Sequence, residues 1–155
     1  DHTAADVRTR FGGLFDDAVT AVARAAQPWP FALDPLQLAR LAMRALPDAD
    51  AWVALHSNPG PEHVFVDPQT RQLTGLIDFG DAYFSHPALD LRRWPRPIDR
   101  AAVHAGYCSE AEMSESFNQT WRVACVLTDM LAIAQDLECR AAGLVELEEL
   151  VEQLH

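Results

Sequence analysis

The 155-residue chain contains no lysine; all twelve of its Lys and Arg residues are arginine. This absence excludes a P-loop lysine, a Schiff-base lysine and a strand lysine that would grip nucleotide phosphates. The chain also lacks any apolar run of about eighteen residues, so no transmembrane helix is expected. Its three cysteines, Cys108, Cys125 and Cys139, are odd in number and widely spaced, which favours free thiols in a reducing compartment. We therefore expect a cytoplasmic protein.

Positive charge is also scarce, since 23 acidic residues face 12 basic ones and the formal net charge is −11. A nucleic-acid backbone or an anionic membrane requires a basic face, so neither is expected as a partner. A cationic small molecule fits this charge balance better. With 49% apolar residues the chain has enough material for one core, and we expect residues 1–155 to form a single domain.

Most of the chain carries helical signals. Apolar spacing or start signals predict helices at five places: about 4–26, 35–46, 88–94, 109–131 and 144–154. Asp34 before Pro35 is an N-cap and first-turn pair for the second helix. Ser109 and Glu112 are spaced as a capping box that would open the fourth helix. Gly143 is expected to separate the last two helices.

Strand signals are confined to the middle of the chain. Three short segments rich in β-branched and aromatic residues are expected to be strands: 52–55, 64–67 and 73–77. The last two flank a polar loop and predict a hairpin, while no strand is expected after Asp81. The expected fold is therefore a mostly helical α+β domain, with its few strands gathered around residues 55–81.

The residues that point to chemistry lie in this same central segment. Residues 56–63 read HSNPGPEH, residues 77–80 read IDFG and residues 87–91 read PALDL. Kinase-like enzymes place an Asp two residues after a loop His, an Asn five residues further on, and a metal-binding Asp before Phe-Gly. In this chain the three positions hold Asn58, His63 and Asp78.

In order and spacing, these motifs resemble the aminoglycoside phosphotransferase family, within the wider group of choline-kinase-like enzymes. A typical member reads His-Gly-Asp-x-x-Pro-x-Asn, then a β-hairpin, Ile-Asp-Phe/Trp and Asp-Pro-x-x-Asp-Leu. The resemblance covers nearly all of the chain and implies the protein-kinase-like C-terminal lobe of that family. We see no counterpart of the N-terminal lobe that carries the strand lysine and covers the nucleotide, so weak or absent nucleotide binding is expected.

The resemblance also implies a role for each motif position. Asn58 stands where the family has its catalytic Asp, and an amide cannot act as a general base. His63 stands where the family has a metal-binding Asn, although imidazole suits zinc, copper or nickel better than magnesium. Asp78 is expected to lose its usual partner; it could still hold a divalent metal with His63 and Asp81, or instead cap its own turn. His56 is either an acid–base group or a structural brace for the loop, the role that the family implies.

Further acidic side chains are candidates for binding a ligand. Carboxylates bind amino groups in aminoglycoside-modifying relatives, and Glu110, Asp129 and Asp136 fall where the family's substrate-binding helices lie. Together with Asp81 they are our candidate ligand contacts, with a solvated helix face as the alternative. Asp90 is expected to tie the loop to the body of the domain.

Three functions stay open at this point, and we favour the first. The chain could be a binding protein that holds a cationic small molecule in an acidic cleft without any nucleotide. It could be a phosphotransferase that uses ATP and magnesium, with an N-terminal lobe supplied by a second chain or missing from this sequence. It could also be an interaction module whose exposed face, normally covered by the other lobe, binds a second copy or another partner.

Overall fold

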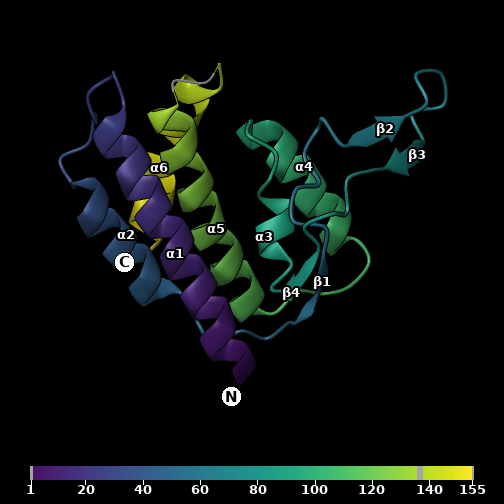
Figure 1. Ribbon diagram of the computed structural model, residues 1–155, viewed down its shortest axis with the longest axis horizontal. Helices are drawn as coiled ribbons and strands as arrows, with labels where there is room; N and C mark the ends of the chain where they lie inside the picture. The colour runs from purple at the N-terminus through teal and green to yellow at the C-terminus, as the bar shows by residue number, and fades with distance from the viewer. Residues whose placement is uncertain (1, 136–137, 155) are drawn as a thin grey trace.

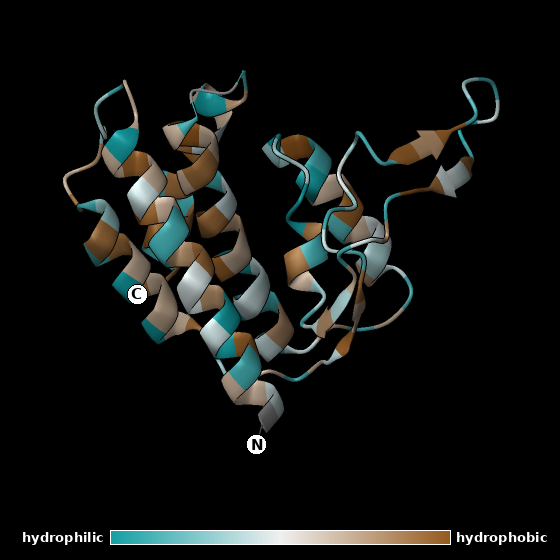
Figure 2. Ribbon diagram, in the orientation of Figure 1, coloured by the Kyte–Doolittle hydropathy of each residue, from teal (hydrophilic) through white to brown (hydrophobic). Residues whose placement is uncertain are grey.

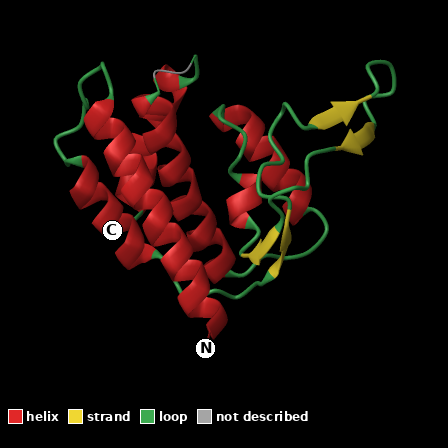
Figure 3. Ribbon diagram, viewed as in Figure 1, coloured by secondary structure: helices red, strands yellow, loops and turns green. Residues whose placement is uncertain are grey.

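Along the chain, helices precede and follow a central set of short strands, as the computed structural model shows for residues 2–135 and 138–154 (Figure 3). In chain order the elements are α1 (His2–Arg24), α2 (Pro35–Ala45), β1 (Val53–Leu55), β2 (Val64–Val66), β3 (Leu73–Leu76), β4 (Tyr83–Ser85), α3 (Ala88–Leu91), α4 (Pro97–Cys108), α5 (Glu115–Ala134) and α6 (Arg140–Gln153). The expected mixture of many helical residues with a few strands is confirmed.

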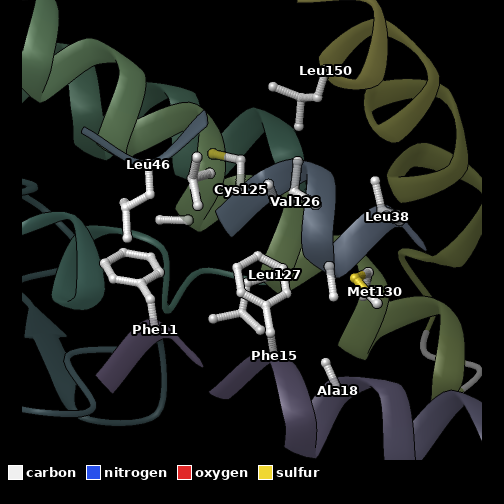
Figure 4. Close-up of a cluster of buried hydrophobic side chains, with 14 of the residues drawn as sticks. Phe11, Phe15, Ala18, Leu38, Leu46, Cys125, Val126, Leu127, Met130 and Leu150 are labelled. Carbon is white, nitrogen blue, oxygen red and sulfur yellow. The ribbon is translucent and has the colours of Figure 1, made fainter. Parts of the chain in front are cut away.

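Helices α1, α2, α5 and α6 form one side of the molecule, and α3, α4 and the strands form the other (Figure 1). Phe11 and Phe15 lie one turn apart on α1, so both point to the same side and pack with Leu127 and Met130 of α5 (Figure 4). All four side chains are almost completely buried. Burial of side chains of this size stabilises the fold by about 1.5–3 kcal/mol each. The bundle therefore supplies a rigid wall, α5, against which the strand side of the molecule lies.

The start of α2 is the one that the sequence predicts. The Asp34 carboxylate accepts a hydrogen bond from the Gln37 backbone N–H at 2.9 Å, and the Gln37 side chain accepts one from the Asp34 N–H at 3.3 Å. Pro35 occupies the first turn, where its missing N–H leaves no intrahelical bond unmade. The local signals at this helix terminus were thus sufficient.

The strands form two separate antiparallel pairs, β1 with β4 and β2 with β3. The predicted hairpin of β2 and β3 is confirmed, and it projects away from the rest of the molecule (Figure 1). Figure 2 shows hydrophobic residues on its strands. Two large ones are exposed, Phe65 at 50% and Leu73 at 67%. The expectation of no strand after Asp81 is wrong, because Tyr83–Ser85 pairs with Val53–Leu55.

Three helix predictions also need correction. Helix α4 is not among the predicted helices; Pro97 occupies its first turn, where a proline is well tolerated. Ser109 ends α4 rather than opening the next helix, and the N-cap of α5 is Ser114, whose hydroxyl accepts from the Phe117 N–H at 2.9 Å. The predicted capping box is therefore wrong.

Gly143 lies inside α6 and does not separate two helices. A Cβ atom at this position would lie 3.4 Å from an Asp129 carboxylate oxygen, so the bare backbone lets α6 approach α5 closely. Within the described part of the chain, no helix combines the length and apolar character that crossing a membrane requires.

Candidate functional site

The loop that follows β1 is held in an uncommon conformation by one carboxylate. Ser57 has a φ of 85°, in the left-handed region that residues other than glycine seldom adopt. Asp90, at α3, accepts hydrogen bonds from the backbone N–H of His56 at 2.7 Å and of Ser57 at 3.0 Å. Bonds to a charged acceptor are stronger than neutral ones. These two contacts support the predicted role of Asp90, which is to tie the loop to the body of the domain.

The His56 ring is buried, and both of its nitrogens have partners. Nε2 lies 2.6 Å from the carbonyl oxygen of Ile77, and the Asn58 N–H donates to Nδ1 at 3.3 Å. Because a carbonyl oxygen can only accept, these contacts assign the proton to Nε2 and leave Nδ1 as the acceptor. The ring also meets Phe79 edge to face, with centroids 4.4 Å apart. This environment favours a brace for the loop over an acid–base group.

Asn58, which the family resemblance assigns to the position of the catalytic carboxylate, is bound to an arginine. Its side-chain oxygen accepts a hydrogen bond from Nε of Arg93 at 2.9 Å. An amide oxygen can accept hydrogen bonds but is too weak a base to take the proton of a hydroxyl group, and the amide nitrogen can only donate. The Asn58 side chain can therefore hold a ligand by hydrogen bonding but cannot deprotonate it.

His63 and Asp78 face each other across the loop. His63 Nδ1 lies 2.7 Å from the backbone oxygen of Asn58, to which it donates, and its Nε2 lies 3.5 Å from a carboxylate oxygen of Asp78. Asp78 itself has a φ of 69° and an exposed side chain. Asp78 therefore lies beside His63, the residue with which the sequence analysis allowed it to share a metal ion.

The donor set of this pair fits a divalent metal ion in part. With Nδ1 donating to Asn58, the Nε2 of neutral His63 carries a lone pair beside the Asp78 carboxylate, and imidazole with carboxylate suits zinc-like ions. The third expected ligand, Asp81, lies exposed in the turn before β4. No group of three or more metal-ligating side chains occurs among the described residues. The pair could thus provide two ligands of an open site, with water or a bound compound completing it.

A cleft of about 380 Å³ lies beside the loop, between its residues and helix α5. Seven of the described residues that line it carry polar side chains: Asn58, Glu62, His63, Arg92, Arg93, Thr128 and Gln135. Gly60 also lines it, and a Cβ atom there would lie only 3.1 Å from the Arg93 carbonyl oxygen. The sequence reasoning did not identify Arg92, Arg93 or Thr128. The available signal was two consecutive arginines, directly after the PALDL motif, in a chain poor in positive charge.

Of the predicted acidic ligand contacts that the structure describes, none lines this cleft. Asp81 is exposed before β4, Glu110 is exposed after α4, and Asp136 lies outside the described residues. Asp129 is completely buried, and Nη2 of Arg100 lies 2.6 Å from its carboxylate. Burial, reinforced by the neighbouring Glu146, raises the pKa of Asp129 to about 8 despite the attraction of Arg100. Asp129 thus connects α5 to α4 inside the protein.

His56, Asn58 and Asp78, whose geometry is described above, are the motif residues from which the family resemblance was drawn. A family model described as the phosphotransferase enzyme family matches residues 4–122, more than half of the chain. The chain belongs to this family, so the resemblance seen in its motifs is confirmed. No curated protein and no solved structure matches the chain.

Proposed function

We propose that this member of the phosphotransferase family binds a small molecule in the cleft beside Asn58 and does not transfer a phosphoryl group with general-base help. One observation carries the proposal: the side chain at the base position is an amide whose oxygen already accepts a hydrogen bond from Arg93, at the wall of an open cleft. Family membership supports a phosphotransferase origin for the cleft.

The chemistry of the base position explains why binding is favoured over turnover. A positioned general base typically contributes about 10²–10⁴ to a reaction rate. A hydroxyl group that enters this cleft meets the NH₂ group of Asn58, which donates a hydrogen bond and cannot accept a proton. The Asn58 oxygen already accepts a hydrogen bond from Arg93; its second lone pair can still accept one from a ligand, but an amide oxygen is too weak a base to remove a proton. The arrangement therefore holds a hydroxyl group without activating it.

A divalent metal at His63 and Asp78 is part of the proposal as an optional component. These two residues would hold it, and a bound ion would polarise a phosphate or hydroxyl oxygen of the ligand. The chain's own contribution is to fix the His63 ring through its bond to the Asn58 carbonyl oxygen. The expectation of a cationic ligand, drawn from net charge, stays a prediction that the same experiments test.

An ATP-dependent phosphotransferase remains the second candidate. The observation that favours it is the intact frame around the replaced base, namely the Asp90-braced loop and the facing pair of His63 and Asp78. On this hypothesis a separate lobe or chain brings the phosphate-gripping lysine that this sequence lacks. It requires that Asn58→Asp, together with such a partner, forms a phosphorylated product from magnesium ATP; no product in that mixture would exclude it.

The test of the first proposal is calorimetric titration with a panel of aminoglycosides, polyamines, sugar phosphates and dicarboxylates. Gln135→Trp places a large ring at the lip of the cleft, whereas Gln153→Trp makes the same change on an exposed part of α6 away from it. We expect at least one compound to bind saturably, to lose most of its affinity in Gln135→Trp and to keep it in Gln153→Trp. A panel without any binding, or equal binding to both variants, would overturn the proposal.

A further inference from the structure

Arg92 is a buried arginine without a carboxylate partner. Its side chain lines the cleft although the residue is only 4% exposed. Among the described residues its guanidinium has one polar contact, a long 3.5 Å approach of Nη1 to the Thr128 hydroxyl, and its buried Nε has no hydrogen-bond partner. A buried charge is unfavourable unless it is paired. The fold therefore maintains a positive charge that its own residues leave unpaired.

The other fully buried arginine shows how this fold treats a structural charge. Arg100 is paired with Asp129 at 2.6 Å and also with Glu146. Its pKa is raised, because these carboxylates outweigh the effect of burial. For Arg92, burial and then the nearby charge of Arg93 lower the pKa to about 10. The guanidinium is still charged at neutral pH, and no carboxylate in the described part of the chain forms an ion pair with it.

Arg93 places a second guanidinium on the same cleft. Its Nε donates to Asn58, which leaves its two terminal nitrogens for other partners. Among the described residues, the acidic one that lines the cleft is Glu62, and its side chain is exposed, whereas Arg92 is buried. Two neighbouring guanidinium groups repel each other, so an anion that contacts both is stabilised by pairing and by relief of this repulsion.

We propose that the cleft recognises an anionic group of its ligand, a phosphate or a carboxylate, which Arg92 and Arg93 bind from two sides. This inference rests on the proposed binding function and specifies the chemical class of the ligand. Arginine suits the role because its planar donor fork matches the oxygens of both groups. The net charge of −11 does not oppose it, because exposed charges are screened beyond about 10 Å whereas contacts inside a cleft are screened much less.

The test follows the side-chain Nε–H signals of the arginines by NMR, in ¹⁵N-labelled protein titrated with inorganic phosphate, with acetate and with chloride at matched ionic strength. We expect the signals of Arg92 and Arg93 to shift saturably with phosphate, with acetate or with both, and the signal of Arg122 on α5 to stay in place. The comparison of phosphate with acetate identifies which anion the site prefers. No shift at Arg92 and Arg93, or an equal shift with chloride, would overturn the inference.

Charge-removing variants supply the second measurement. Arg93→Gln, at a half-buried position, should weaken anion binding by about tenfold to a hundredfold, the effect of losing a hydrogen bond to a charged group. Arg92→Gln should do the same, and its circular dichroism spectrum shows whether it folds. Arg122→Gln removes the same charge from a position whose partner is Glu115 and should bind like the unchanged protein. Unchanged affinity in Arg93→Gln would contradict the inference.

The panel of charged compounds separates this inference from the proposed function. If a polyamine or aminoglycoside binds in a manner that Gln135→Trp abolishes, while phosphate and acetate leave the Arg92 and Arg93 signals in place, the inference is wrong and the binding function stands. If no compound of either sign binds, both are wrong. Binding of a phosphate- or carboxylate-bearing compound that Arg93→Gln weakens supports both.

Discussion

Replacing Asp90 by alanine removes the carboxylate that accepts two backbone hydrogen bonds from the loop after β1. Two backbone N–H groups, of His56 and Ser57, lose a charged acceptor at 2.7 and 3.0 Å. Each hydrogen bond to a charged group contributes about 1.5–3 kcal/mol, and two bonds to a shared carboxylate are not fully additive. We therefore expect a loss of about 3 kcal/mol in the free energy of unfolding, which for a chain of this size lowers the Tm by about 6–12 °C.

Thermal unfolding followed by circular dichroism measures this change, with Asp17→Ala on the exposed face of α1 as the matched control. Asp90→Asn keeps one acceptor oxygen and should fall between the two alanine variants. Ligand binding in the cleft should weaken in Asp90→Ala even well below its Tm, because the loop that presents Asn58 is then no longer braced. If Asp90→Ala melts within about 2 °C of the Asp17→Ala control, less than 1 kcal/mol is lost and the carboxylate does not brace the loop.

Three further predictions concern the helices behind the site. Burial raises the pKa of Asp129 from its ordinary 3.8 to about 8 in the folded protein. Between these two pKa values the folded state binds more protons than the unfolded state. The contribution of Asp129 to the free energy of unfolding is therefore complete at low pH and is lost as the pH rises towards 8, by about 1.4 kcal/mol per pH unit. Urea unfolding at several pH values should show this slope in the unchanged protein and not in Asp129→Asn; parallel curves would contradict it. Leu127 of α5 is fully buried in the core that α5 shares with α1, so Leu127→Ala should lower the free energy of unfolding by about 2–5 kcal/mol. A loss below about 1 kcal/mol in a urea titration would be inconsistent with this packing. Ser114→Ala removes the N-cap of α5 and should destabilise by about 0.5–2 kcal/mol in the same assay, where no change would refute the cap.

The elements that the sequence predicts correctly have local signals. Asp34, Pro35 and Gln37 specify the start of α2 within four residues, and the hairpin of β2 and β3 follows from two short strands around a polar loop. Strand β4 has no such signal, because its three residues are stabilised by pairing with β1, which lies about thirty residues earlier in the chain. Helix α4 was missed because prolines at its start are typical of loops as well as of first helical turns.

The candidate site divides in the same way. The motif spacing predicted that residues 56–63 and Asp78 belong to one site, and the structure places His63 beside Asp78. The burial of Asp129 and the unpaired charge of Arg92 depend on how α5 packs against α3, α4 and α6, which no local pattern reports. The net charge of −11 favoured a cationic ligand, but an average over the whole chain cannot reveal that two arginines share one cleft.

The most direct test of the account is to measure phosphoryl transfer and ligand binding on the same sample. Purified protein is given magnesium ATP and a compound that binds in the cleft, and product formation is followed while calorimetry records binding. The account predicts saturable binding with turnover at least about 10²-fold below the 1–100 s⁻¹ that is typical of kinases. Turnover within that range, with Asn58 in place, would contradict it.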